Sequence, residues 1–163
     1  MAEPQREYQQ KRNFYPNYHE DTNLSKHTYD ISENYSVKIL ELIEKAFDLA
    51  ESLSIREVSP QIILKTVQND SDASAILGYY TAGQIINFDL EPKNENTDIV
   101  LLSVDSKRLL LLAFLEAQKF GRKIVEIDDL VLAMIQFPNL NKVLNEIDLF
   151  EAEKKTATRL GGS

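Results

Sequence analysis

The chain contains two related copies of one segment, set sixty-seven residues apart. The copies share Ser36-Val37 with Ser103-Val104, Ala46-Phe47 with Ala113-Phe114, and Ala50 with Ala117. One inserted residue then shifts the offset to sixty-eight, which aligns Leu64 with Leu132. Self-similarity at a fixed period indicates repetition of one supersecondary unit, but two long copies are too few for an extended repeat array. The pattern therefore predicts one domain whose halves are related by a pseudo-twofold axis.

Each copy has the pattern of a group of helices. In the first copy the apolar residues recur at helical spacing, as Leu40, Ile43, Phe47 and Ala50. Ser59 followed by Pro60 predicts the start of a second helix, because serine caps helices and proline suits their first position. In the second copy we expect Ser103 to cap a long helix and Asp128 a short one, and no useful strand alternation is present. The predicted fold is all-α, with two pseudo-symmetric four-helix repeats packed into one domain.

The composition divides the chain into five segments. Residues 1–33 are polar and rich in tyrosine, which indicates a disordered tail; the alternative is a segment that docks through its aromatic side chains. We expect the first repeat over 34–88, an acidic linker over 89–102, the second repeat over 103–155, and a C-terminal tail or linker over 156–163. Gly78 is expected to end a third helix, and residues 79–88 to form an irregular fourth. The corresponding third helix of the second copy is predicted from Leu140, Val143 and Leu144.

The residue types restrict the chemistry open to the repeats. The chain has no cysteine, and its two histidines, His19 and His27, precede both copies, so neither copy can hold a Ser–His or Cys–His nucleophile pair. No glycine-rich phosphate-binding motif is present. We therefore expect no enzymatic activity, no cofactor and no metal. Glu126, Asp128 and Asp129 could bind a divalent cation through oxygen atoms, but such a cluster is more often a solvated helix start.

The charge and hydropathy patterns restrict the partners. A net charge of −8 argues against the basic surface that nucleic-acid binding requires. No apolar run approaches the roughly 20 residues of a membrane span, and the polar N-terminus is not a signal peptide. The absence of cysteine is compatible with a reducing compartment. We expect a cytoplasmic protein that binds neither membranes nor nucleic acids.

The order of these elements resembles the double N-terminal domain of the Clp-type AAA+ unfoldases. The resemblance covers about residues 34–150 and rests on segments 46–50, 58–64 and 75–78 of the first copy and 117–121, 125, 128–134 and 143–144 of the second. In that family the domain is a mobile, non-catalytic recognition module that binds adaptors, unfolded segments or, in some members, phosphoarginine. The resemblance implies the same role here, beside a Clp ATPase ring in the same chain or in a separate one. The chain carries no ATPase module, and its Tyr-rich tail is not part of the family pattern.

The resemblance also suggests where a partner binds. The family's phosphoarginine pockets use a glutamate at the start of each short leucine-rich helix. Gln61 and Asp128 stand at those positions here, and Ile62 and Asp129 replace a neighbouring histidine, which disfavours phosphoarginine binding at least in the first copy. Gln61 and Asp128 are otherwise polar residues that stabilise helix starts.

We expect a protein segment or adaptor to bind at the junction of the halves. Ile62 would offer apolar contact there, while Glu126, Asp128 and Asp129 would select a basic partner side chain. The other hypothesis left open is a structural or scaffold protein of the same fold that self-associates or binds partners through its tail.

Overall fold

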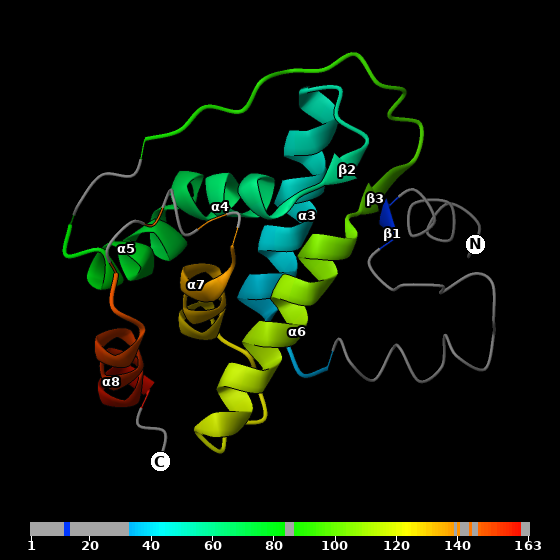
Figure 1. The fold of residues 1–163 in the computed structure, drawn as a ribbon. Helices are drawn as coiled ribbons and strands as arrows, with labels where there is room; N and C mark the ends of the chain where they lie inside the picture. The colour runs from blue at the N-terminus through cyan, green and yellow to red at the C-terminus, as the bar shows by residue number, and fades with distance from the viewer. Residues whose placement is uncertain are drawn as a thin grey trace.

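The computed structural model describes residues 12–13, 33–83, 87–138, 140, 144 and 147–160. Most of this described part is helical, in α3 (Val37–Ser52), α4 (Pro60–Asn69), α5 (Ser71–Tyr80), α6 (Val104–Lys119), α7 (Ile127–Gln136) and α8 (Leu149–Leu160). Three very short strands accompany the helices: β1 (Arg12–Asn13), β2 (Glu57–Val58) and β3 (Val100–Leu102). Figure 1 shows these elements from the N-terminus to the C-terminus. The prediction of a mainly helical protein is confirmed.

The two long helices begin and end in the same way. The side chains of Ser36 and Ser103 accept hydrogen bonds from the third residue of α3 and α6 respectively, and the cap at Ser103 was predicted. After each helix one residue turns into the left-handed backbone region, Ser54 with φ 54° and Gly121 with φ 72°. Glycine adopts this conformation at no steric cost, whereas a residue with a Cβ atom pays about 1 kcal/mol. Gly121 therefore ends the second long helix without backbone strain.

Two pairs of helices are separated by the same number of residues. α6 (Val104–Lys119) lies 67 residues after α3 (Val37–Ser52), and α7 (Ile127–Gln136) lies 67 residues after α4 (Pro60–Asn69). At this offset Leu64 would correspond to Val131, so these helix bounds do not show the one-residue insertion that was predicted before Leu132. Residues 130–135 of α7 are all apolar and buried, so this stretch has no single apolar stripe from which to read its register.

Helix α7 lies at the centre of the domain. It contacts α5, α6 and α8, and every residue from Ile127 to Ile135 is buried. This stretch includes two carboxylates, Asp128 and Asp129, each with 0% of its surface exposed. Buried carboxylates require hydrogen-bond donors or positive charge, so their surroundings decide what the start of α7 can do.

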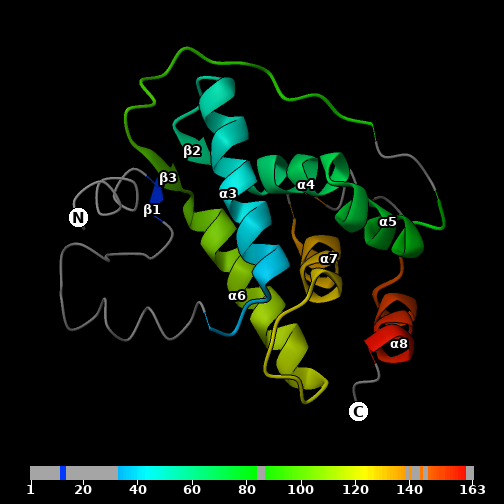
Figure 2. The ribbon, with the colours of Figure 1, turned by 180° about the vertical axis from the view of Figure 1, so that it is seen from behind.

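A small parallel sheet, which the sequence pattern did not indicate, joins the loops. Its strand order is β1-β3-β2, and the three strands are parallel. A separate bridge pairs Tyr35 with Val125 in the same parallel sense. Strands of two or three residues are too short for alternation to be visible, which is why the pattern failed to predict them. Figure 2 shows β2 and β3 beside one end of α3, away from α7 and α8.

Several predicted boundaries were wrong. Gly78 lies inside α5, which continues to Tyr80 and is followed by a turn at 81–83, so no fourth helix fills the described part of 79–88. The last three residues of the expected linker form β3. Residues 156–160, expected as a tail, continue α8 to Leu160.

Other predictions fall outside the described residues. They concern Val143, most of the N-terminal tail and the extreme C-terminus, although Leu140 and Leu144 are described and buried. Within the described ranges, no helix has both the length and the apolar character to cross a bilayer.

Candidate protein-binding site

The start of α4 keeps one of its predicted binding residues near the surface and buries the other. Ser59 caps the helix, and its Oγ accepts the N–H of Ile62 at 3.3 Å. The Ile62 side chain is 1% exposed and belongs to the hydrophobic core, while Gln61 is half-buried. Ile62 therefore offers a partner little direct apolar contact, and that part of the prediction is wrong.

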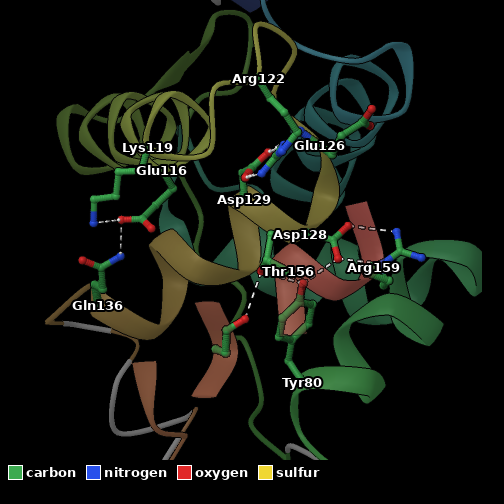
Figure 3. Close-up of polar contacts among 11 residues, drawn as sticks. Tyr80, Glu116, Lys119, Arg122, Glu126, Asp128, Asp129, Gln136, Thr156 and Arg159 are labelled. Carbon is green, nitrogen blue, oxygen red and sulfur yellow. Dashed lines mark hydrogen bonds and ion pairs between the residues drawn. The ribbon is translucent and has the colours of Figure 1, made fainter. Parts of the chain in front are cut away.

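The start of α7 is closed by an ion pair. Arg122 places its guanidinium on both carboxylate oxygens of Asp129, with Nη1 2.6 Å from Oδ2. Asp129 also accepts the backbone N–H of Glu126 at 2.8 Å, so this carboxylate caps its own helix. The N-cap residue is Glu126 rather than the predicted Asp128. In Figure 3, Arg122 and Glu126 lie beside Asp129.

Asp128 lies in a second buried group, which we name the Asp128 network: Tyr80, Asp128, Thr156 and Arg159. Arg159 reaches Asp128 from the last turn of α8, with Nε 2.6 Å from Oδ2 and Nη2 2.9 Å from Oδ1. The Tyr80 hydroxyl donates to Asp128 Oδ2 at 2.5 Å and lies 2.8 Å from Thr156 Oγ1. Burial, and then the hydrogen bond to Asp128, raise the pKa of Tyr80 well above its usual range, so this phenol remains a donor. The network joins α5, α7 and α8 (Figure 3).

These contacts correct the predicted role of the acidic residues. Asp128 and Asp129 are fully buried, and each already holds an arginine of the same chain, so neither is available to select a basic side chain of a partner. The same pairing makes a divalent-cation site at Glu126, Asp128 and Asp129 unfavourable, because two of the three carboxylates already neutralise an arginine. No group of three or more potential metal-ligating side chains occurs among the residues with described positions. Arg122 and Arg159 were not among the predicted site residues; only the short spacing from Arg122 to Asp129 could have indicated a pair.

A third polar cluster joins α6, α7 and α8. Glu116 is 0% exposed, and its Oε2 accepts from Lys119 at 2.8 Å and from Gln136 at 3.0 Å. Its Oε1 has no hydrogen-bond partner among the residues that the structure describes. Burial, and then the neighbouring Glu116, raise the pKa of Glu153 above its ordinary value. Glu116 lies inside the helical packing, whereas the Lys119 side chain is 55% exposed at the edge of the cluster.

The described residues do form a surface groove on the side of the α4 start. This groove, named here the linker groove, has a volume of about 720 Å³ and lies among β2, β3, the first turn of α4 and the extended segment 89–95. Its apolar lining consists of Ile55, Ile62, Leu90, Ile99 and Leu101. Ile99 is 53% exposed and Leu101 is 37% exposed, so the groove presents apolar surface to solvent. A volume of this size is within the usual range of ligand sites in proteins.

The extended segment that forms one wall of the groove is fixed to the loop after α3. The backbone N–H groups of Lys93 and Glu95 donate to the carbonyl oxygens of Leu53 and Ser54, each at 2.9 Å. The Glu95 carboxylate in turn accepts the N–H of Arg56 at 2.8 Å. These bonds hold an otherwise irregular, acidic stretch at a defined distance from the sheet.

The linker groove carries an excess of negative charge. Four carboxylates line it, those of Glu57, Asp89, Glu91 and Glu95, against two cationic side chains, those of Arg56 and Lys93. An apolar lining with an acidic rim favours a ligand that combines apolar and basic groups. Neither histidine nor cysteine contributes to the lining, so the groove contains no nucleophile–base pair of the usual kind.

Comparison with known proteins establishes the fold alone. No protein-family model and no curated protein matches the chain. Among solved structures, the chain is similar to one described as "Preliminary structural investigations of a malarial protein secretion system", with a TM-score of 0.60 and 20% sequence identity. The similarity covers 78% of this chain and 94% of that chain. At this level of identity it carries no conclusion about shared activity.

Proposed function

We propose that the chain is a non-catalytic, cytoplasmic protein-recognition module that binds segments of adaptor or substrate proteins. The observation that carries this proposal is the linker groove, with its exposed apolar residues Ile99 and Leu101 inside an acidic rim. Exposed apolar surface within a shaped groove is typical of a binding site rather than of ordinary protein surface. A polypeptide segment supplies apolar side chains, basic side chains and backbone hydrogen-bonding groups together, which is the combination that this groove can accept.

The proposal includes the architecture suggested by the sequence resemblance, two pseudo-symmetric repeats similar to the N-terminal domain of Clp-type unfoldases. The constant offset of the helix pairs α3/α6 and α4/α7 supports it, as do their matching serine caps at Ser36 and Ser103. On this proposal the module acts beside a Clp ATPase ring, in the same chain or in a separate one. Its affinity for a segment is weak, as transient handover requires.

The test is an NMR titration of the isotope-labelled chain with two synthetic peptides. One peptide alternates lysine with valine, and the other has glutamate in place of each lysine. We expect the lysine peptide alone to perturb the signals of residues 55–57 and 89–101. Ile99→Ser should weaken this binding at least about tenfold, through loss of apolar contact. Ile124→Ser is the matched control, because Ile124 is 42% exposed but does not line the groove.

Two results would count against the proposal. Equal binding of both peptides would show that the acidic rim selects nothing. Perturbations spread over α5 and α8, with the groove signals unchanged, would move binding to another face. If instead the unliganded chain sediments as a concentration-dependent oligomer and binds neither peptide, the scaffold hypothesis is the better one.

A further inference from the structure

The backbone N–H and C=O groups of β3, the middle strand of the small sheet, point alternately toward its two neighbouring strands. On the β2 side, the N–H groups of Leu101 and Ser103 donate to the carbonyl oxygens of Arg56 and Val58, each at 3.0 Å. Backbone groups alternate in direction along a strand, so those of Val100 and Leu102 point to the opposite edge. That opposite edge is the one paired with β1.

The strand on that edge is short and comes from the N-terminal segment. β1 consists of Arg12 and Asn13, which stand in register with Val100 and Leu101. Two residues offer only a few backbone hydrogen bonds, each contributing about 1 kcal/mol. An unpaired strand edge is a template for another extended chain, so the same edge can accept any segment that presents a strand.

The edge lies directly beside the linker groove. Leu101 is both the register partner of Asn13 and a lining residue of the groove. The chain around β1 reads Lys11-Arg12-Asn13-Phe14-Tyr15, two basic residues followed closely by two aromatic ones. This composition complements the acidic rim and apolar lining of the groove, which carries four carboxylates against two cations.

We propose that β1 is an exchangeable occupant of the β3 edge, and that a partner binds by replacing it with an extended segment of its own that carries basic and aromatic side chains. The partner strand hydrogen-bonds to Val100 and Leu102, and its side chains contact the linker groove. This proposal rests on the proposed function, since it specifies how the segment is bound and what it displaces.

Tethering gives β1 an advantage that a partner must overcome. A segment attached to the same chain acts at an effective concentration in the millimolar range, so it competes with any free segment. The apparent affinity for a partner equals the intrinsic affinity multiplied by the fraction of chains in which the edge is open. Weakening β1 should therefore increase the affinity for a segment in trans, while leaving the groove side chains unchanged.

The experiment uses the full chain and amide hydrogen exchange measured by NMR. The test variant combines Arg12→Pro and Asn13→Pro, because proline has no N–H to donate and cannot continue a strand edge. Thr22→Pro with Asn23→Pro is the control, with the same number of prolines elsewhere in the N-terminal segment. The probe is a synthetic peptide of residues 8–18, and a version with prolines at the β1 positions is its negative control.

We expect the Val100 and Leu102 amides to exchange at least about tenfold faster in the test variant than in the wild type. The Leu101 and Ser103 amides, which donate to β2, should be unaffected and serve as internal controls. Addition of the probe should restore the slow exchange, and the probe should bind the test variant at least about tenfold more tightly than the wild type. The control variant should behave as the wild type.

Three results would overturn the proposal. Unchanged Val100 and Leu102 exchange in the test variant would show that β1 does not protect this edge. Failure of the probe to restore protection would show that the edge accepts no strand in trans. Wild-type protection that grows with protein concentration, together with a dimer in sedimentation, would assign the edge to a second copy of the chain. Any of these can occur while the lysine peptide still binds the groove, so the proposed function is tested separately.

Discussion

We expect the two charged residues of the Asp128 network, Asp128 and Arg159, to differ in how much their replacement lowers the free energy of unfolding. Replacing Arg159 with methionine leaves the Asp128 carboxylate, which is 0% exposed, without its counter-charge. Replacing Asp128 with asparagine leaves instead a guanidinium whose side chain is already 38% exposed and can turn to water. Removal of one partner of a buried pair costs about 3–5 kcal/mol when the remaining charge stays buried.

The structure sets the expected sizes of these losses. The Tyr80 hydroxyl still donates to Asp128 after Arg159→Met, and part of the site is near solvent, so we expect a loss at the lower end of this range, about 3 kcal/mol. For Asp128→Asn we expect about 1 kcal/mol, the usual net worth of a hydrogen bond, because Tyr80 keeps its contact with Thr156. The double variant should be more stable than Arg159→Met alone, since it contains no unpaired buried charge.

Urea unfolding followed by circular dichroism measures these free energies. Arg108→Met is the matched control: its partner is Asp105 at 3.5 Å, and the two side chains are 70% and 44% exposed. An exposed pair of this kind contributes less than about 0.5 kcal/mol. A loss for Asp128→Asn that equals or exceeds that for Arg159→Met would refute the argument. A double variant less stable than either single variant would do so as well.

Four further outcomes are expected. Phe47→Ala should lower the free energy of unfolding by about 3–5 kcal/mol, because Phe47 is 1% exposed. Phe114 is half-buried, so Phe114→Ala should cost clearly less. Thermal melts that show similar losses for both variants would contradict this difference. Asp70→Ala should cost about 1–2 kcal/mol as a lost N-cap, and the loss should persist at pH 4, because the Ala73 N–H and then two lysines hold the pKa of Asp70 well below its usual range. The pKa of Glu153 is raised in the folded state, so folding favours its protonated form. The stabilising contribution of Glu153 is therefore present below the ordinary pKa of 4.5 and is lost as pH rises through the folded value. Glu153→Gln should raise the melting temperature at pH 7 and change it little at pH 4. No ATP hydrolysis above the blank is expected from the purified chain, and turnover that survives a control preparation would contradict the non-enzyme proposal.

The local helix signals were predictable because they depend on neighbouring residues. Ser59 and Ser103 cap the helices that they were expected to cap, and Ser36 and Asp70 cap α3 and α5 in the same way. Each of these bonds joins atoms three residues apart, so the residue type and its position are enough to predict it. The same locality explains the stop at Gly121.

The predictions that failed depend on residues distant in the sequence. Arg159 meets Asp128 across 31 residues, and Tyr80 meets Thr156 across 76. Residues 156–160 are polar and charged, which is the composition of a tail. Only the contact of Arg159 with the buried Asp128 carboxylate shows why they continue a helix. The acidic stretch 89–95 likewise looked like a free linker, yet its backbone bonds to the loop after α3 make it a wall of the groove.

The two helix starts differ in the character of one pair of residues. Ile55 and Ile62 are separated by the same seven residues as Arg122 and Asp129, and the two pairs occupy positions 67 residues apart. At α7 this pair is a buried ion pair that satisfies itself and caps the helix. At α4 the pair is apolar: Ile55 is 8% and Ile62 1% exposed, so both belong to the core behind the linker groove rather than to its exposed surface. Exchange of Ile55 and Ile62 for Arg and Asp would therefore give the α4 start the polar character of the α7 start and replace core side chains that support the groove.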